Sequence, residues 1–403
     1  MARRPVPWVN RLRVTNYKSV AASDVTLEPL TVLLGPNAAG KSNFLDALAF
    51  VADAVETTPS KAIDARGGLF EILRRSPEPA DSFSIALDVT VPWGPEPEQW
   101  ASGEYSFEIA PSQRRGQRPF EVVREECMLR WRNTTERFRV DRGVVDDPSM
   151  QRIREIERDR LYLPTAGARP NLAPLFGALR GMRFYHLDTT TLRLPQPQIE
   201  GASLGDRGAH LGDVLGALDT EYPAIKQRLD AYLAAVAPGI EGVDRFHAGS
   251  YVTVQMHQRN DDQELTFGPE AMSDGTIRAV GILAALFQPW VFDGRISLVG
   301  IEEPEAALHP AAAGVLFDAL TEASERVQVL VTSQSADLLD RDDLDPSIIR
   351  AVANKEGLTV IGDVNAASLR ALREHRFTAG ELLRAGQISP ESPAEAGSAS
   401  VGR

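Results

Sequence analysis

The sequence predicts an α/β fold in which a parallel sheet covered by helices is joined to a lobe of antiparallel strands. Two stretches carry most of this prediction. An apolar strand over residues 31–35 runs through a glycine-containing loop into an amphipathic helix over 41–56. In the last third, strand 296–303, helix 309–324 and strand 327–333 alternate. This order is typical of parallel strands joined by a helical crossover.

Hydrophobic periodicity predicts the remaining elements. Alternating runs between Ser82 and Arg142 indicate the antiparallel strands, and no heptad run is present, so no long coiled coil is expected. The other expected elements are strands over 12–17, 24–28, 251–258 and 264–268, and helices over 171–180, 209–218, 221–236 and 275–287.

Bulk composition restricts the classes of function. The formal net charge of −13 argues against a protein that coats nucleic acid by default, although a local basic groove remains open. The single cysteine, Cys127, excludes an internal disulfide and fits a reducing compartment. No signal peptide is recognised and no apolar run approaches the roughly 20 residues of a membrane span. We therefore expect a cytoplasmic protein with no membrane partner.

The segment GPNAAGKS, residues 35–42, matches the phosphate-binding pattern G-x-x-x-x-G-K-[ST] between a strand and a helix. Glycines permit a close backbone approach, and successive N–H groups with the helix N-terminus attract an anion. The lysine can reach the β- and γ-phosphates, and the hydroxyl of Ser42 suits Mg²⁺. The sequence thus predicts ATP and Mg²⁺ as cofactors. The expected cofactor-binding residues of this P-loop are Gly35, Pro36, Asn37, Ala38, Ala39, Gly40, Lys41, Ser42 and Asn43.

An acidic strand end supplies the second half of such a site. The segment LVGIEE places Glu302 and Glu303 directly after apolar residues. Glu302 is predicted to hold Mg²⁺, directly or through water, together with Ser42. Glu303 is predicted to orient or deprotonate the attacking water. The alternative is an ordinary solvated strand end.

Several motifs in order resemble those of RecF and SMC-type proteins, the ABC-class ATPases that are not transporters. RLRVTNYKSV and GPNAAGKSN resemble the N-terminal motifs of this AAA-family group. MSDGT (272–276), IEEPEAALHP (301–310) and VLVTSQSADLLD resemble its signature, Walker B and switch segments. FTAGELLRAGQI (377–388) and LGDRGAHLGDVLGAL (204–218) resemble a subgroup of stand-alone bacterial ATPases related to the OLD type. The resemblance covers about residues 11–388.

The resemblance implies the fold of a P-loop NTPase of the ABC/SMC-head type, with an inserted α+β lobe and no long coiled coil. One ATPase head, residues 1–388, is then split by an insertion, and a disordered tail follows. The N-terminal part with Walker A spans 11–80, the inserted lobe 81–245, the C-terminal part 246–388 and the tail 389–403.

The resemblance also implies an ATP-dependent head-to-tail homodimer, in which the signature loop of one protomer completes the ATP site of its partner. Ser273 and Gly275 are the expected γ-phosphate contacts. Without the family, SDGT is only a helix cap and turn. Lys18 is expected near the nucleotide, with a solvated turn lysine as the alternative. Arg74 and Arg75 could also reach phosphates, or could remain in solvent.

Gln334 stands where many ABC-class ATPases carry a histidine that contacts the γ-phosphate and the attacking water. A glutamine offers a donor and an acceptor but does not change charge near pH 7. We therefore expect Glu303 and Gln334 to be the catalytic pair of a slow ATPase. His309 is expected either at the dimer interface or simply at a helix start.

The leading functional hypothesis is an ATP-driven switch that acts on double-stranded DNA or on a separately encoded nuclease or toxin, in DNA repair or antiviral defence. The alternative is a scaffold that ATP assembles with little turnover. A transporter subunit is disfavoured because the interval between Ser42 and Ser273 is too long. The chain has no recognisable nuclease domain: the acids of 341–345 fit a solvated loop. The basic run 113–118 fits either a nucleic-acid contact or a hairpin tip.

Overall fold

The computed structural model describes residues 8–75, 80–93, 99–112, 119–149, 154–260, 263–341 and 343–391. Contacts between Cα atoms divide the chain into two compact units. Unit 1 takes the described residues of Met1–Met182, Ser347–Ala366 and Ile388–Arg403. Unit 2 takes those of Arg183–Pro346 and Ala367–Gln387. The division at Met182 falls inside the segment 81–245 that the sequence groups as one lobe, since strands up to residue 155 extend the sheet of unit 1.

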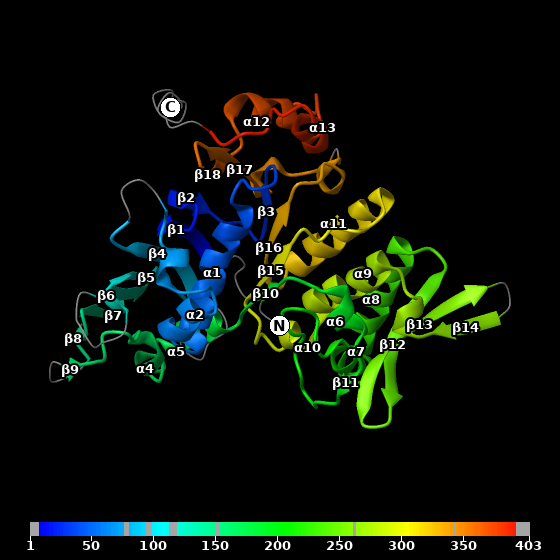
Figure 1. Cartoon of the computed structure of the whole chain (residues 1–403), viewed down its shortest axis with the longest axis horizontal. Coiled ribbons are helices and arrows are strands. Elements are labelled where there is room, and N and C mark those ends of the chain that lie inside the picture. Colours follow the sequence, from blue (N-terminus) through cyan, green and yellow to red (C-terminus); the bar gives the residue numbers. More distant parts are fainter. Residues whose placement is uncertain are drawn as a thin grey trace. The chain divides into compact units, whose positions relative to one another are not determined.

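Unit 1 is built on a long mixed sheet with the strand order β3-β17-β18-β2-β1-β4-β5-β6-β7-β8-β9 (Figure 1). β3 pairs with β17, and β18 with β2, in parallel, whereas β4 to β9 form an antiparallel series. The strands are β1 (Val9–Tyr17), β2 (Val20–Thr26), β3 (Leu30–Leu34), β4 (Phe83–Pro92), β5 (Trp100–Pro111), β6 (Phe120–Trp131), β7 (Thr134–Asp141), β8 (Val144–Asp146), β9 (Arg154–Glu155), β17 (Ile349–Lys355) and β18 (Leu358–Asp363).

Helix α1 (Lys41–Glu56) supplies much of the core of unit 1. Its apolar residues, among them Phe44, Leu48 and Val51, are fully buried. Phe50 packs edge-on against Tyr17 and Phe83 with ring centroids 5.3–6.0 Å apart, which ties α1 to β1 and β4. The other helices of unit 1 are α2 (Pro59–Asp64), α3 (Leu69–Ile72), α4 (Leu163–Ala166) and α5 (Ala173–Arg180).

Unit 2 contains the predicted strand–helix–strand crossover. β15 (Leu298–Glu302) and β16 (Gln328–Ser333) pair in parallel and are joined by α11 (Pro310–Ser324), which confirms the prediction from the last third of the sequence. β10 (Met182–Tyr185) pairs with β15. A second sheet has the order β11-β13-β12, and β14 pairs with β13. Its strands are β11 (Gln196–Pro197), β12 (Ile240–Ala248), β13 (Tyr251–Asn260) and β14 (Gln263–Phe267).

The remaining helices of unit 2 include α9 (Asp274–Phe287), whose residues from Ile277 to Phe287 are almost all buried. The stretch Asp274–Phe292 is long and apolar enough to span a membrane, although the sequence analysis expected no such run. It is 72% buried, and the core helix of a globular unit can be equally long and apolar. These helices are α6 (Thr189–Arg193), α7 (Leu211–Glu221), α8 (Pro223–Val236), α9 (Asp274–Phe287), α10 (Pro289–Phe292), α12 (Ala366–Arg373), α13 (Ala379–Arg384), and the 3-10 turns η1 (Pro269–Ala271), η2 (Asp337–Leu339) and η3 (Pro346–Ile348).

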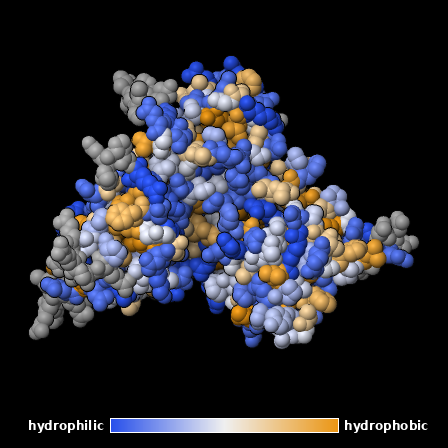
Figure 2. All heavy atoms as spheres, viewed as in Figure 1, coloured by the Kyte–Doolittle hydropathy of each residue, from blue (hydrophilic) through white to orange (hydrophobic). Residues whose placement is uncertain are grey.

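The outer face drawn in Figure 2 is mostly hydrophilic, with apolar residues scattered across it. This agrees with a chain in which a quarter of all residues are charged. The longest helix in the described ranges is α1 with 16 residues, so the prediction that no long coiled coil is present holds there.

Candidate functional site

The predicted P-loop joins β3 to α1 in unit 1, and its two glycines lie against neighbouring strands. A Cβ on Gly35 would lie 2.1 Å from the carbonyl oxygen of Val352 on β17. A Cβ on Gly40 would lie 1.9 Å from Thr359 Oγ1 on β18, and Gly40 also has a φ of +99°. Space excludes a side chain at both positions, and the left-handed backbone of Gly40 disfavours one there as well.

Lys41 is buried at the first turn of α1 and is held inside the loop. Its Nζ donates to the carbonyl oxygens of Gly35 at 2.8 Å and Pro36 at 3.0 Å. α1 has no side-chain cap at its N-terminus and no acidic residue in its first turn. A buried cation beside an uncapped helix N-terminus suits a phosphate group. The residues present therefore fit a nucleoside triphosphate.

The β1–β2 turn brings Lys18 to the side of α1. Its Nζ lies 2.6 Å from Asp46 Oδ2, and Asn43 Nδ2 donates to Ser19 Oγ at 2.6 Å. Sequence reasoning missed Asp46, which also accepts from Arg66 Nε at 2.8 Å. An acid on the polar face of a P-loop helix was the available signal. The turn and the helix thus contact each other through two predicted cofactor-binding residues, Lys18 and Asn43.

Arg74 and Arg75 follow α3 in unit 1 and have partners in the protein. Arg74 Nε donates to Asn16 Oδ1 at 2.9 Å, and Arg75 forms an exposed ion pair with Glu71. Their predicted reach to phosphates stays a prediction. Arg74 lies beside the β1–β2 turn, because the nearby Ile72 O accepts a hydrogen bond from Lys18 N at 2.6 Å.

The acidic strand end lies in unit 2, where β15 ends at Glu302. Glu303 has a left-handed backbone with a φ of +44°, which is uncommon for a residue with a side chain. Its N–H donates to Thr332 O at 3.0 Å and lies 3.2 Å from Thr332 Oγ1. Gln334, two residues beyond Thr332, donates from Nε2 to Glu303 Oε2 at 3.2 Å. The structure therefore brings together the two residues predicted to be catalytic.

Two residues that sequence reasoning missed support this strand end. Arg278 on α9 donates from Nη2 to the carbonyl oxygens of Glu302 at 3.2 Å and Glu303 at 3.1 Å. Glu305 accepts a hydrogen bond from the hydroxyl of Ser333. Burial lowers the pKa of Arg278 and raises the pKa of Glu305. A lone arginine within the apolar run of α9 was the signal for the first of these residues.

The signature segment begins α9 in the same unit. Ser273 is the N-cap residue, and its Oγ accepts from Thr276 N at 3.1 Å, as the simple cap interpretation requires. A Cβ on Gly275 would lie 2.4 Å from Ala307 O, so packing within this chain requires a glycine at this position. Asp274 pairs with Arg193 at 2.7 Å. A contact of Ser273 and Gly275 with a nucleotide stays a prediction.

Other predicted positions have local explanations. His309 is the N-cap residue of α11, and its Nδ1 accepts from Ala311 N at 3.2 Å. Asp343 pairs with Arg341 at 2.8 Å in an exposed loop. Cys127 is buried on β6, and this burial raises the pKa of its thiol. The basic run 113–118 lies outside the described residues, as do residues 392–403 of the expected tail.

No group of three or more His, Cys, Asp or Glu side chains in the described ranges could hold a metal by itself. The expected roles of Ser42 and Glu302 as Mg²⁺ ligands stay a prediction; Mg²⁺ commonly uses one or two carboxylates together with substrate phosphates. Ser42 is exposed at the start of α1, and Glu302 is half-buried at the end of β15.

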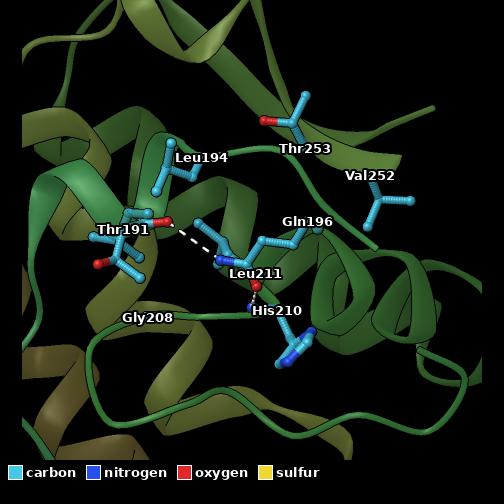
Figure 3. A pocket seen from close by; sticks show the side chains of 10 residues that line it. Thr191, Leu194, Gln196, Gly208, His210, Leu211, Val252 and Thr253 are labelled. Atoms are coloured by element: carbon cyan, nitrogen blue, oxygen red, sulfur yellow. Dashed lines mark hydrogen bonds between the residues drawn. The ribbon is translucent and has the colours of Figure 1, made fainter. Parts of the chain in front are cut away.

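A small pocket in unit 2 lies within the predicted segment 204–218 and its neighbours (Figure 3). His210 N donates to Gln196 Oε1 at 2.8 Å, and Gln196 Nε2 donates to Thr191 O at 3.5 Å. The free volume is about 10 Å³, roughly the space of one water molecule. The pocket is too small for a nucleotide, and these contacts order the start of α7.

Comparisons with known proteins agree with the fold. A family model described as "AAA domain, putative AbiEii toxin, Type IV TA system" matches residues 30–340. No curated protein matches the chain. Among solved structures, an SMC head bound to the C-terminal winged-helix domain of ScpA has a TM-score of 0.54 at 15% identity, over 88% of this chain and 97% of that one. An SMC head with an extended coiled coil, bound to the C-terminal domain of ScpA from Pyrococcus furiosus, has a TM-score of 0.54 at 13% identity, over 92% and 99%. These likenesses show the fold of an SMC-type P-loop head.

Proposed function

We propose, on the premise that this chain belongs to the AAA-domain family of AbiEii type, that it is an ATP-binding and ATP-hydrolysing molecular switch. The contact between Gln334 Nε2 and Glu303 Oε2 carries this proposal. It unites a carboxylate that can accept a proton from water with an amide that can hold that water. If the end of β15 were only a solvated strand end, no contact between Glu303 and Gln334 would be needed.

ATP is the proposed cofactor, with the P-loop of unit 1 as its phosphate-binding element. Lys41 and the N-terminus of α1 favour the negative charge of the β- and γ-phosphates. Ser42 and Glu302 are the proposed Mg²⁺ ligands, and the ion neutralises charge on the phosphates when bound. Ser273 and Gly275 of the signature segment are proposed to contact the γ-phosphate of the ATP held by a second protomer. ATP would then close a head-to-tail homodimer and hydrolysis would open it.

The output of the switch is proposed to reach double-stranded DNA or a separately encoded effector, such as a nuclease or toxin. The family description names a toxin–antitoxin setting, and both SMC heads were solved with a domain of ScpA, a separate protein. Antiviral defence and DNA repair are the settings that we propose. A cytoplasmic location is proposed because the only cysteine, Cys127, is a buried free thiol, as a reducing compartment favours.

The first test is the steady-state ATPase rate of the wild type and of Glu303→Gln, each with and without double-stranded DNA. We expect slow hydrolysis by the wild type and at least a tenfold loss in the variant, because the amide cannot accept the proton. Equal rates for the two proteins under every condition would exclude the hydrolytic switch and favour a scaffold that ATP assembles.

The second test is the oligomeric state of Glu303→Gln by size-exclusion chromatography with and without ATP and Mg²⁺. We expect a dimer only with the nucleotide, because a variant that binds without hydrolysing accumulates the closed form. Lys41→Ala is the matched control, since it should stay monomeric in both conditions. A monomer in every sample would contradict the shared site.

A further inference from the structure

The C-terminal segment 377–388 has no role in the chemistry described so far, yet it contacts the loop that carries Gln334. Helix α13 begins after Thr378 with a reciprocal cap. Thr378 Oγ1 accepts from Glu381 N at 3.1 Å, and Glu381 Oε2 accepts from Thr378 N at 2.9 Å. This cap fixes the direction in which the short helix starts.

Three polar contacts join α13 to residues 337–340. Thr378 Oγ1 donates to Asp340 Oδ1 at 2.5 Å. Arg384 donates from Nη1 to Asp340 Oδ2 at 2.9 Å and from Nη2 to Asp337 Oδ1 at 2.8 Å. These hydrogen bonds lower the pKa of Asp340, so its carboxylate keeps its charge near neutral pH. A guanidinium shared by two carboxylates fixes their spacing more tightly than a single ion pair does.

Gly380 adds a backbone contact to the same segment. A Cβ at this position would lie 2.6 Å from Ala336 O and 3.0 Å from Asp340 Cβ. The helix therefore packs directly on the chain two residues after Gln334, and a side chain at position 380 would push that chain away. We call the set Thr378, Gly380, Arg384, Asp337 and Asp340 the switch clamp.

Gln334 lies between the switch clamp and a second fixed point. On one side, Ser333 Oγ donates to Glu305 Oε1. On the other side, Ser335 N donates to Ser333 Oγ at 3.0 Å, and Asp337 N donates to Ser335 Oγ at 3.2 Å. These hydrogen-bonded turns restrict the backbone on both sides of Gln334. A shift of residues 336–340 should therefore move Gln334 and change its hydrogen bond with Glu303.

We propose that the switch clamp positions Gln334 for hydrolysis, with Thr378 and Arg384 as positioning residues. The proposal rests on the proposed ATPase function. The ion pairs are partly exposed: the side chains of Arg384, Asp337 and Asp340 are 51%, 42% and 33% exposed. Each pair alone contributes little to the free energy of unfolding, so a substitution at Arg384 should leave the fold intact.

The main test compares the kinetics of Arg384→Glu with those of Arg370→Glu. Arg370 is an exposed residue of the preceding helix α12 that takes no part in the clamp contacts, and its substitution makes the same change of charge. We expect Arg384→Glu to lower kcat about fivefold with an unchanged KM for ATP, because Gln334 is displaced while the P-loop is not altered. The kcat of Arg384→Lys should lie between those of Arg384→Glu and Arg370→Glu, since an ammonium cannot bridge both carboxylates with a planar fork.

A second pair of variants tests the backbone contact. Gly380→Ala should reduce kcat, whereas Gly314→Ala on α11, where a Cβ meets open space, should not. Hydrogen exchange in the peptide covering 334–340 should rise in Arg384→Glu and Gly380→Ala but not in the two controls. This readout does not depend on ATPase activity.

The possible outcomes distinguish a failure of the clamp proposal from a failure of the proposed ATPase function. Wild-type protein without ATPase activity would overturn the proposed function and the catalytic role of the clamp together. If the wild type hydrolyses ATP and Arg384→Glu has the same kcat, the clamp proposal alone is overturned. An equal loss of kcat in Arg384→Glu and Arg370→Glu would overturn it as well. A rise in kcat, or a change in KM of the same size, would also refute it.

Discussion

Glu125 on β6 gives a prediction whose magnitude follows from the structure. Its carboxyl is fully buried. Oε1 accepts hydrogen bonds from Leu163 N and Tyr105 Oη, each at 3.0 Å, and Oε2 accepts one from Tyr162 N. Burial raises the pKa of Glu125 from 4.5 to about 7. The three donors favour the ionised form and offset only part of the desolvation cost.

A raised pKa in the folded chain sets the sign of the pH dependence. The native chain keeps this proton over a range in which the unfolded chain has released it. The free energy of unfolding therefore falls as the pH rises from about 4.5 through about 7. The difference between the two pKa values corresponds to about 3 kcal/mol. This contribution is complete below pH 4.5 and is lost above pH 7.

The variant Glu125→Gln removes the titration, because an amide stays neutral at every pH. It also turns an NH₂ group toward one of three donors, which costs about 1–3 kcal/mol independently of pH. We expect urea unfolding, followed by circular dichroism at pH 5 and pH 8, to show a loss of stability about 2–3 kcal/mol larger in the wild type than in the variant. The neighbouring Glu126→Gln, which changes an exposed charge, should keep the wild-type dependence. Parallel pH profiles for the wild type and Glu125→Gln would refute the reasoning.

Four further predictions concern the candidate site. Gln334→Ala should lower the rate of phosphate release about tenfold, whereas Gln334→His should preserve or raise it; an alanine variant with the wild-type rate would make Gln334 an ordinary loop residue. Gly40→Ala should weaken binding of a fluorescent ATP analogue more than tenfold, since its Cβ would meet Thr359 Oγ1 at 1.9 Å, while Gly314→Ala should bind normally. Arg278→Gln should reduce kcat several-fold with ATP binding retained, because the Glu302 and Glu303 carbonyls lose their donor; a matching loss of binding would point to misfolding instead. Chelation of Mg²⁺ by EDTA should stop phosphate release, and added Mg²⁺ should restore it; undiminished turnover in EDTA would exclude the proposed ion.

Local patterns predicted much of the fold. The helix expected over 41–56 is α1 with the same bounds, and the predicted crossover is β15–α11–β16 with parallel pairing. These elements are visible in sequence because their signals are short-range: apolar spacing, a glycine loop and a proline at the start of α11. The pairing of Glu303 with Gln334 was expected from the resemblance of the switch segment to that of ABC-class ATPases, and the structure places the two side chains in contact.

Long-range pairing could not be read in this way. β17 and β18 join β3 and β2 although hundreds of residues separate them, as the bond from Arg350 Nη2 to Thr26 Oγ1 illustrates at a separation of 324 positions. Thr359 and Val352 therefore gave no sign that they restrict the P-loop glycines. The burial of Glu125 was equally hidden, because an acid on an alternating strand is expected to face solvent.

The geometry at Gln334 explains how a neutral side chain can serve the proposed hydrolysis. Its Nε2 donates to one oxygen of Glu303, which turns the amide oxygen away from that bond. An attacking water has two protons to donate, and the carboxylate and the amide oxygen are two acceptors for them. Water held in this way points a lone pair elsewhere, as attack on phosphorus requires. A neutral histidine also has one donor and one acceptor nitrogen, so it can replace the amide. Alanine has neither a donor nor an acceptor in its side chain. The Gln334→Ala variant should therefore hydrolyse ATP more slowly than the Gln334→His variant.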